Sequence, residues 1–464
     1  MGRNADITDG TCDKPLVIFS AGGKGTRIQS LNASVPKPMI PIAGKPVLQW
    51  GIENLAEQGF HRFIITVSHL AEKITEYFKD GADFGCSIEY YYEAEPLGNA
   101  GALYKLWESG RLEDNFFYLM ADAVFSVDWD RFYRFHLMKG ALASLFVHPN
   151  SHPYDSGIVI SDPQTGIVTD WLNKEDERPE WYKNSVNAGL QILSTELLRV
   201  SGIHTSAAGS KEGRKKIDLD RDVLKPLINT RRIMAYTSSE YCKDAGTPER
   251  FHAVEKDIEN GVTWARNLKN PQKAIFAGWN SIVAQYAETL RVSDEFELLP
   301  GAGEAVHRIN ESGYLAIAVT NKPDTDSGET EDGMLRNKME TLLGHLEAYF
   351  DVVYDCPQHP VSGFEGETSV MQEVHDYCRI QSEMLAKAGR DFNVDLCHSW
   401  FIGSSRRSVV CGKNAGCRTV YINSGKRGSR SGAEADYTAA SLFEAVKLIL
   451  DDVNEIPLIS EKNR

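Results

Sequence analysis

The sequence lacks the patterns that mark membrane, secreted and disulfide-stabilised proteins. No run of roughly 18 apolar residues is present, so no membrane-spanning helix is predicted. Residues 1–14 contain no apolar segment typical of a signal peptide, and we expect a flexible tail there. The eight cysteines are scattered and form no Cys-x-x-Cys pair. This usage favours a reducing compartment, and we expect a cytoplasmic protein.

Positive charge is also scarce, because 50 Lys and Arg residues face 65 Asp and Glu residues. The resulting net charge of −15 argues against nucleic acid and against an anionic membrane surface as partners. A chain of 464 residues, of which 42% are hydrophobic, is too long for one ordinary core. We therefore expect two domains, at residues 15–265 and 273–452, joined by a polar segment that ends in Asn-Pro.

A glycine-rich turn follows the first apolar run, residues 16–20, which has the composition of a buried parallel strand. The turn is neither a Walker loop nor a Gly-x-Gly-x-x-Gly motif. Because glycine has no Cβ atom, the backbone N–H groups of such a turn can close around phosphate oxygens. The side chains of Arg27 and Lys37 would add positive charge at the same edge of the sheet. A turn that binds no ligand is the alternative. The candidate phosphate-binding residues are Gly22, Gly23, Gly25, Thr26, Arg27 and Lys37.

The run Gly-Gly-x-Gly-Thr-Arg, followed by Pro-Lys-Pro, resembles the signature of the sugar-1-phosphate nucleotidyltransferases. The resemblance extends from about residue 15 to 261. Within that superfamily it is most similar to guanylyltransferases acting on mannose 1-phosphate or D-glycero-D-manno-heptose 1-phosphate. It implies that Gly22, Gly23 and Gly25 contact phosphates through their backbone, and that Arg27 and Lys37 neutralise the β/γ- and α-phosphates.

Strands alternate with helices up to residue 122, which predicts βαβ units and a parallel sheet. Ligands of such sheets bind at the carboxyl ends of the strands. Asp122 ends an apolar strand at that edge, where its carboxylate would suit Mg²⁺ shared with phosphates. Its alternative role is an N-cap of the next helix, for which Asp128 is better placed.

The segment Glu-Ala-Glu-Pro-Leu-Gly follows another predicted strand and resembles the base-binding motif of the family. A carboxylate here, such as that of Glu95, could accept hydrogen bonds from the N1–H and N2–H₂ groups of guanine, and Gly98 would let the backbone approach a flat base. A turn that caps a helix is the alternative.

Four further residues gain a role only from the resemblance. Lys174 matches the lysine that meets the sugar phosphate, although by spacing alone it would be a solvated surface charge. Asn187 and Gly189 match the Asn-x-Gly beside the sugar hydroxyls, and Glu175 could accept hydrogen bonds from hydroxyls. Asp244, which precedes Gly-Thr-Pro, matches the second metal ligand.

Residues 273–425 resemble a haloacid-dehalogenase-like sugar phosphatase of the type that acts on heptose bisphosphate. Gly278 stands where that family has its nucleophilic Asp, Asn280 replaces the acid/base, and Ser404 lies where a metal-binding acid is expected. Ile380 and Gln381 follow Cys-Arg, so the phosphate-holding lysine is missing. We therefore expect no hydrolysis. A weak zinc site is left open at the remnants of a zinc loop, Cys356, His359, Asp376 and Cys378.

The predicted fold is an α/β, Rossmann-like nucleotidyltransferase domain with a mixed central sheet, plus a second α/β haloacid-dehalogenase-like domain. The predicted reaction transfers GMP from GTP to a sugar 1-phosphate with Mg²⁺ and releases pyrophosphate, and a homo-oligomer is one expected assembly. One alternative is a regulatory subunit that binds nucleotide-sugar without turnover. The other is a nucleotidyltransferase for glucose- or fucose-type phosphates.

Overall fold

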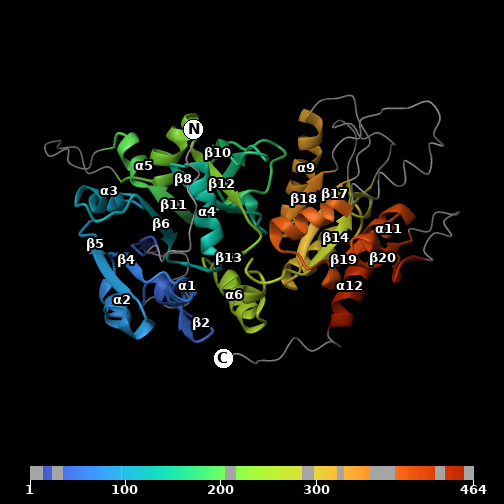
Figure 1. The fold of residues 1–464 in the computed structure, drawn as a ribbon, viewed down its shortest axis with the longest axis horizontal. Helices are drawn as coiled ribbons and strands as arrows, with labels where there is room; N and C mark the ends of the chain where they lie inside the picture. Colours follow the sequence, from blue (N-terminus) through green and yellow to red (C-terminus); the bar gives the residue numbers. More distant parts are fainter. Residues whose placement is uncertain are drawn as a thin grey trace, which may run out of the picture.

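The chain forms two α/β units, each built around its own sheet (Figure 1). The computed structural model describes residues 14–22, 35–95, 97–203, 216–284, 297–320, 329–355, 382–423 and 434–453. Over these ranges, every helix is too short or too polar to cross a bilayer.

The first unit holds a nine-stranded mixed sheet with the order β10-β9-β11-β6-β1-β4-β5, and β8 joins β11 to β12 beside this path. Strands β6, β1, β4 and β5 run parallel, whereas β11 is antiparallel to both β6 and β8. The strands are β1 (Val17–Ser20), β4 (Arg62–Val67), β5 (Ser87–Tyr92), β6 (Asn115–Met120), β8 (Ala143–His148), β9 (Ile158–Ser161), β10 (Val168–Leu172), β11 (Val186–Ser194) and β12 (Ile233–Thr237).

Two smaller pairs of antiparallel strands and a set of helices complete this unit. The pairs are β2 (Pro41–Ile42) with β3 (Lys45–Pro46), and β7 (Ala123–Ser126) with β13 (Tyr241–Asp244). The α-helices are α1 (Val47–Ala56), α2 (Ala71–Phe78), α3 (Gly101–Glu108), α4 (Trp129–Lys139), α5 (Thr195–Val200), α6 (Pro248–Glu259) and α7 (Val262–Ala265). The short 3₁₀ and π helices are η2 (Lys37–Met39), η3 (Ala82–Phe84), η4 (Pro153–Asp155), η5 (Leu219–Leu224) and η6 (Lys225–Thr230).

Helices cover both faces of this sheet, as the continuous apolar composition of β1 predicts. Val17 and Phe19 pack on one side with residues of α1, α2 and α4. Ile18 points to the other side, where α3 and α5 close the second core. Because β11 runs antiparallel to β6 and β8 while the other central strands are parallel, the predicted mixed sheet is also confirmed.

Local capping signals also gave the correct helix starts. The Asp128 carboxylate accepts a hydrogen bond from the backbone N–H of Arg131 (3.1 Å) and caps α4. Thr247 caps α6, with Pro248 at the first helical position. Capping therefore occupies Asp128 and leaves Asp122 available for another role.

One predicted helix differs in type from an ordinary α-helix. The sequence predicts a capped helix over residues 218–227, and Asp218 does cap it through the N–H of Arg221 (2.9 Å). The backbone, however, forms the π turn η5 and then the 3₁₀ helix η6. Pro226 has no N–H to donate, so a regular α-helical ladder cannot continue through it.

The second unit contains a sheet of six parallel strands with the order β18-β17-β14-β19-β20-β21. These strands are β14 (Ala274–Gly278), β17 (Leu315–Thr320), β18 (Val352–Asp355), β19 (Trp400–Gly403), β20 (Arg418–Ile422) and β21 (Tyr437–Ala439). The other elements are η7 (Trp279–Ser281), β15 (Val283–Ala284), β16 (Glu297–Leu298), α8 (Ala302–Glu311), α9 (Glu329–Gly344), a helix over 382–392, η8 (Leu396–His398), α11 (Arg406–Asn414) and α12 (Leu442–Val453).

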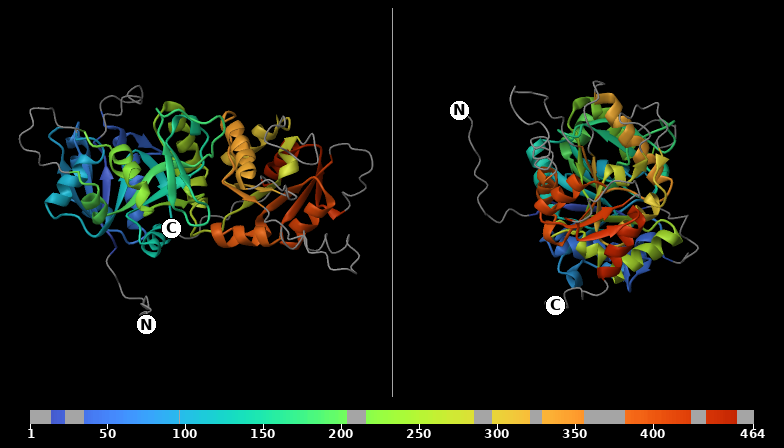
Figure 2. Two further views of the ribbon diagram at one scale, coloured as in Figure 1. Left: turned by 90° about the horizontal axis from the view of Figure 1, so that it is seen from above. Right: turned by 90° about the vertical axis from the view of Figure 1, so that its right-hand side faces the viewer.

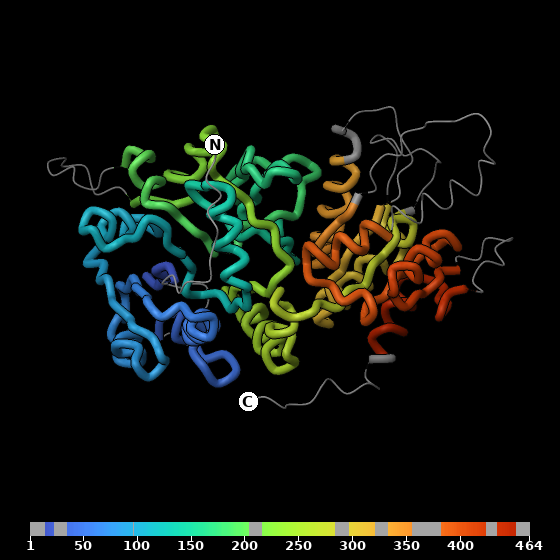
Figure 3. The backbone as a smooth tube through the Cα atoms, in the orientation of Figure 1, coloured from blue at the N-terminus to red at the C-terminus, as the bar shows by residue number. Residues whose placement is uncertain are grey.

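The two units lie side by side, the first coloured blue to green and the second yellow to red (Figure 2). The tube view follows the backbone from one unit into the other, with α9 of the second unit turned toward the first (Figure 3). The likeness of the second unit to haloacid dehalogenases and the domain limits at 15–265 and 273–452 stay predictions.

Candidate active site

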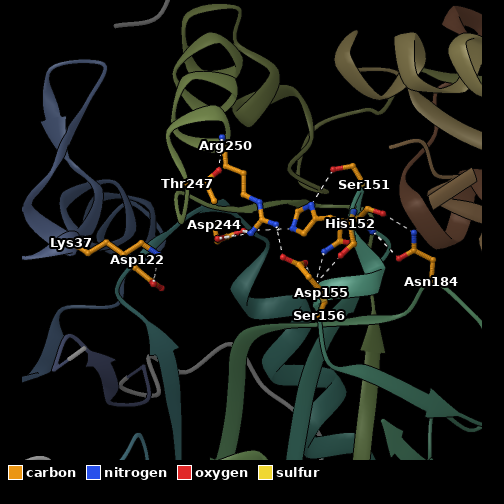
Figure 4. A network of polar contacts seen from close by, with 11 residues as sticks. Lys37, Asp122, Ser151, His152, Asp155, Ser156, Asn184, Asp244, Thr247 and Arg250 are labelled. Carbon is orange, nitrogen blue, oxygen red and sulfur yellow. Dashed lines mark hydrogen bonds and ion pairs between the residues drawn. The ribbon is translucent and has the colours of Figure 1, made fainter. Parts of the chain in front are cut away.

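Lys37 and Asp122 form an ion pair at the carboxyl edge of the first sheet (Figure 4). Asp122 follows β6 by two residues. Lys37 is the first residue of η2 and stands between Pro36 and Pro38, whose rings restrict the backbone there. The Lys37 Nζ and Asp122 Oδ2 atoms are 2.5 Å apart, with only 13% of the lysine side chain exposed. The predicted cation and the predicted metal ligand thus occupy one place.

Asp244 reaches the same place from a distant part of the chain. It is the last residue of β13 and pairs with Ala123 at the start of β7, directly after Asp122. The N–H of Ala245 donates to the carbonyl of Asp122 (3.3 Å). A Cβ atom on Gly246 would lie 2.4 Å from Asp244 Oδ2 and 3.6 Å from Lys37 Nζ. Both predicted metal ligands therefore border one small space.

Three residues that sequence reasoning did not single out surround Asp244 (Figure 4). Arg250, in the first turn of α6, lies 3.2 Å from Asp244 Oδ2 and 3.0 Å from Asp155 Oδ2. His152 Nε2 lies 3.8 Å from Asp244 Oδ1. His152 and Asp155 stand in a polar stretch of the sequence, but no local sequence pattern indicates that this stretch contacts α6.

The surroundings of this network lower the pKa values of Asp155 and His152. Burial alone would raise the pKa of Asp155, but the hydrogen bond and charge of Arg250 hold it below its usual value. Burial, and then the charge of Arg250, lower the pKa of His152, although Asp155 and Asp244 oppose this shift. His152 is consequently neutral at neutral pH, and Arg250 is the cation that the two carboxylates share.

Lys174 and Glu175 are exposed on the loop after β10. The positive charge of Lys174 contributes to lowering the pKa values of both His152 and Asp155, so it lies near this network. The negative charge of Glu175 instead contributes to raising the pKa of Arg221 on η5. The structure therefore places Lys174 on the Asp244 side and Glu175 toward η5.

Asn187 and Gly189 lie together on β11, as the resemblance implies. The Asn187 side chain accepts from the N–H of Gly189 (3.2 Å) and approaches both carboxylate oxygens of Asp220 at 3.5 Å. Gly189 has a φ of +73°, and a Cβ there would lie 2.6 Å from Met120 Cγ, so only glycine fits.

Asp220 is a further candidate that the sequence analysis passed over. Burial, and then the neighbouring Asp218, raise its pKa to about 7, although hydrogen bonds from Asn187 and Gln191 oppose the shift. It lies on the π turn η5, a backbone form that is common at functional sites. A carboxyl group poised near neutrality beside Asn187 can donate or accept a hydrogen bond.

Only Gly22 of the glycine-rich turn lies within the described residues, and its carbonyl accepts from the Ser68 hydroxyl (2.9 Å). A Cβ on Gly22 would lie 3.6 Å from a Glu93 carboxylate oxygen. Burial raises the pKa of Glu93, against a hydrogen bond from the backbone of Leu97. The other predicted phosphate-binding residues of this turn lie outside the described residues: Gly23, Gly25, Thr26 and Arg27.

Close packing of the backbone requires glycine at position 98, and the local sequence did not indicate this contact. Gly98 has a φ of +86°, and a Cβ there would lie 2.2 Å from the carbonyl oxygen of Ile217. Two backbone bonds hold this approach, from Ile217 to Leu97 (2.8 Å) and from Ala100 to Ile217 (3.1 Å). Its contact with a base stays a prediction, as does that of Glu95, which is exposed.

Mg²⁺ suits the pair Asp122 and Asp244. Within the described ranges, no cluster of three or more His, Cys, Asp or Glu side chains could hold a metal ion. Mg²⁺ needs only one or two protein carboxylates when phosphates and water complete its shell. Two carboxylates beside Lys37 and Arg250 therefore fit a metal that arrives with a triphosphate.

A cavity of about 470 Å³ lies at the opposite edge of the first sheet. Its lining includes Asn115, the first residue of β6, and Ser194, the last residue of β11. Asp122 follows the other end of β6, so this cavity is separate from the candidate active site.

In the second unit, three of the positions that the resemblance singled out lie at or just after the ends of strands. Gly278 ends β14, Asn280 is exposed on η7, and Ser404 follows β19. The predicted zinc loop lies outside the described residues: Cys356, His359, Asp376 and Cys378.

Comparison with known proteins places residues 16–261 in the nucleotidyl transferase family. UTP–glucose-1-phosphate uridylyltransferase of Synechocystis sp. is 34% identical over 193 residues, 39% of this chain and 49% of that protein. Mannose-1-phosphate guanyltransferase of Kluyveromyces lactis is 30% identical over 270 residues, 57% of this chain and 69% of that protein. The chain thus spans about half to two thirds of these curated relatives. A solved structure, HddC from Yersinia pseudotuberculosis, is 24% identical and covers 53% of this chain and 100% of its own, with a TM-score of 0.44.

Proposed function

The chain belongs to the nucleotidyl transferase family, and we propose from this that it transfers a nucleoside monophosphate to a sugar 1-phosphate. The observation that supports the proposal most is the meeting of Lys37, Asp122 and Asp244 at one edge of the sheet. These residues are distant in sequence, and they supply the charges that a triphosphate and its metal require.

The reaction needs positioning more than acid–base chemistry. A phosphate oxygen of the sugar 1-phosphate attacks the α-phosphorus, and a new P–O bond forms. The bond from the α-phosphorus to the oxygen of the β-phosphate breaks, and pyrophosphate leaves with its electron pair. The attacking oxygen is already an anion, so holding the reactants in line and neutralising charge suffice.

Lys37 would neutralise charge on the α-phosphate, and Asp122 and Asp244 would hold Mg²⁺. When bound, the ion supplies Lewis-acid stabilisation of the phosphate oxygens. Arg250 keeps Asp244 in place and links it to Asp155. Lys174, Asn187 and Gly189 would meet the sugar phosphate and its hydroxyls, with Glu175 as a further acceptor.

We propose GTP as the nucleotide and mannose 1-phosphate or D-glycero-D-manno-heptose 1-phosphate as the sugar. Relatives named as guanyltransferases support GTP, whereas the Synechocystis relative is named as a uridylyltransferase. The wrong base would leave a buried polar group unpaired, and we expect it to lower kcat/KM about 10–100-fold. The heptose rests on the resemblance of the first unit to guanylyltransferases of that sugar and on the resemblance of the second unit to a heptose bisphosphate phosphatase.

A matrix of four nucleoside triphosphates against several sugar 1-phosphates, with Mg²⁺, tests the proposal by pyrophosphate release. We expect turnover with at least one pair. Binding of a nucleotide-sugar without any pyrophosphate release would instead establish the regulatory-subunit alternative. Comparable kcat/KM for GTP, CTP and dTTP would contradict the choice of base but not the reaction.

For the second unit, we propose a haloacid-dehalogenase-like fold that no longer hydrolyses phosphate. Gly278 has no side chain that could form an aspartyl-phosphate. The full-length protein, incubated with a sugar bisphosphate and Mg²⁺, should release no inorganic phosphate. Release that survives Asp122→Asn but is abolished by Asn280→Ala would contradict this proposal.

A further inference from the structure

Helix α9 of the second unit docks on the irregular segment that precedes β11 in the first unit. The Glu340 carboxylate accepts a hydrogen bond from the backbone N–H of Asn184 (2.7 Å). The Thr341 hydroxyl accepts from the N–H of Tyr182 (3.0 Å) and donates to its carbonyl (3.1 Å). Both side chains are buried, so these bonds are shielded from water.

The same helix reaches the loop that carries His152 and Asp155. Its last residue, Gly344, lies so close to η4 that an added Cβ would be 2.8 Å from Pro153 Cγ. The Asn184 side chain donates to the carbonyl of Asn150 (2.6 Å) and accepts from its N–H (3.0 Å). Asn150 in turn accepts from the N–H of His152 (3.0 Å). The second unit thus approaches the residue 150–156 loop at Pro153 and is linked to Asn150 through Asn184.

This loop leads directly to the candidate active site. Asp155 pairs with Arg250, Arg250 pairs with Asp244, and His152 lies beside Asp244 (Figure 4). The hydrogen-bonded path therefore runs without a gap from Glu340 through Asn184 and Asn150 to the loop. The hydrogen bonds that Glu340 and Thr341 make to the first unit are with Asn184 and Tyr182, so these two residues would act on the site through that segment.

We propose that Glu340 and Thr341 are positioning residues, through which the second unit sets the geometry of the sugar-phosphate side of the transferase site. This inference rests on the proposed function. Without these two side chains, the N–H groups of Tyr182 and Asn184 lose their acceptors, which is unfavourable for a buried segment. The segment has no strand or helix of its own to order it, so the 150–156 loop loses part of its support.

A role in positioning predicts a selective kinetic effect. Glu340→Ala and Thr341→Val should each raise KM for the sugar 1-phosphate about 10-fold or more, because displacing a binding group by about 1 Å can have effects of this size. KM for the nucleoside triphosphate should stay within about twofold, since Lys37 and Asp122 lie outside this path and the pairing of β13 with β7 also holds Asp244. Glu304→Ala on α8 is the matched control, because Glu304 is exposed and forms its ion pair with Arg308 on the same helix.

Asn184→Ala separates positioning from simple cohesion of the two units. It keeps the backbone N–H that Glu340 accepts but removes both side-chain bonds to Asn150. We expect the same selective rise in KM, and little further rise when it is combined with Glu340→Ala, because both act along one path. Additive effects in the double variant would overturn the proposal.

Hydrogen–deuterium exchange provides a readout that needs no turnover. Peptides covering residues 150–156 should take up deuterium faster in Glu340→Ala and Thr341→Val than in wild type or Glu304→Ala. If the wild type releases no pyrophosphate with any substrate pair, the proposed function fails, and exchange alone still decides whether α9 orders the loop. Unchanged exchange, or a KM that rises equally for both substrates, would overturn the inference. Thr341→Val removes only one hydroxyl and covers the case in which Glu340→Ala does not fold.

Discussion

The carboxyl edges of the two sheets carry different side chains although both sheets contain parallel strands at their centres. In the first unit, Asp122 and Asp244 meet Lys37 and Arg250 at this edge. In the second unit, the three central strands end in Gly278, Thr320 and Gly403. A parallel sheet offers the same place for a ligand in both cases, so the difference shows that the site residues, and not the fold, decide the chemistry.

The buried charges of the second unit lie at its contact with the first. Asp351 and Arg266 form an ion pair with both side chains almost fully buried, and Arg266 also donates to the carbonyl of Ser239 (2.9 Å). Glu340 accepts from Asn184 at the same contact. We therefore propose that charge serves chemistry in the first unit and attachment in the second, and this contrast can be tested.

The largest expected effect is on stability, from Asp351→Ala. It leaves Arg266 buried without its carboxylate, and removing one partner of a buried ion pair costs about 3–5 kcal/mol. It also removes the acceptor of the Ala316 N–H (2.8 Å). Urea unfolding should show the loss, whereas Asp83→Ala, at an exposed pair with Lys79, should change stability little. A loss below about 1 kcal/mol would contradict a structural role for this charge.

The next effect is on activity, from Asp122→Asn or Asp244→Asn. Each change keeps the size of the side chain but removes a charge from the proposed Mg²⁺ site, and turnover should fall about 10²-fold or more, ~3 kcal/mol of barrier. The midpoint of urea unfolding should move far less than in Asp351→Ala. Asp83→Asn serves as the control for kcat. Near-normal turnover at saturating Mg²⁺ would remove these residues from the metal site.

A third test asks whether Glu240, a buried acid of the first unit, contributes to stability instead of serving the candidate active site. Glu240 accepts from the N–H groups of Asp128 (2.6 Å) and Leu268 (3.1 Å), which ties the junction between the units to α4. Burial raises its pKa to about 7, although these hydrogen bonds oppose the shift. Because the folded-state pKa lies above the unfolded value, the folded protein binds the proton more tightly.

Stability from Glu240 is therefore fully present below about pH 4.5 and is lost as pH rises through about 7, by about 1–3 kcal/mol. Glu240→Gln, which stays neutral, should flatten this part of the dependence of unfolding free energy on pH. The difference between the two proteins isolates Glu240 from Asp220, which also titrates near 7. Identical pH profiles would show that Glu240 does not titrate in this range.

The smallest expected effect comes from Gly246→Ala. The added Cβ would lie 2.4 Å from Asp244 Oδ2 and must displace this carboxylate. We expect kcat/KM to fall about 10-fold, ~1.4 kcal/mol, with little change in thermal stability. Gly333→Ala on α9 is the matched control, because nothing lies within 4 Å of its added Cβ. Equal activity in both variants would show that the position of Asp244 is not critical.

Much of the fold could be predicted because it depends on local patterns. The apolar run at β1 predicted a strand with both faces buried, and Asp128 and Thr247-Pro248 marked the starts of α4 and α6. Of the candidate site, Asp122 could be proposed from its place after a strand. Asp244, Lys174, Asn187 and Gly189 needed the resemblance to a family, since their own spacing indicates no chemistry.

Sequence alone therefore determined the alternation of strands and helices and the helix caps, because these depend on residues within a few positions of one another. Tertiary structure alone decided that Arg250 joins Asp155 to Asp244 and that Glu340 meets Asn184, 156 positions away. It also decided the raised pKa of Asp220. Contacts between distant segments and the burial of a charge arise only when whole sheets and helices pack, and no short stretch of sequence encodes that packing.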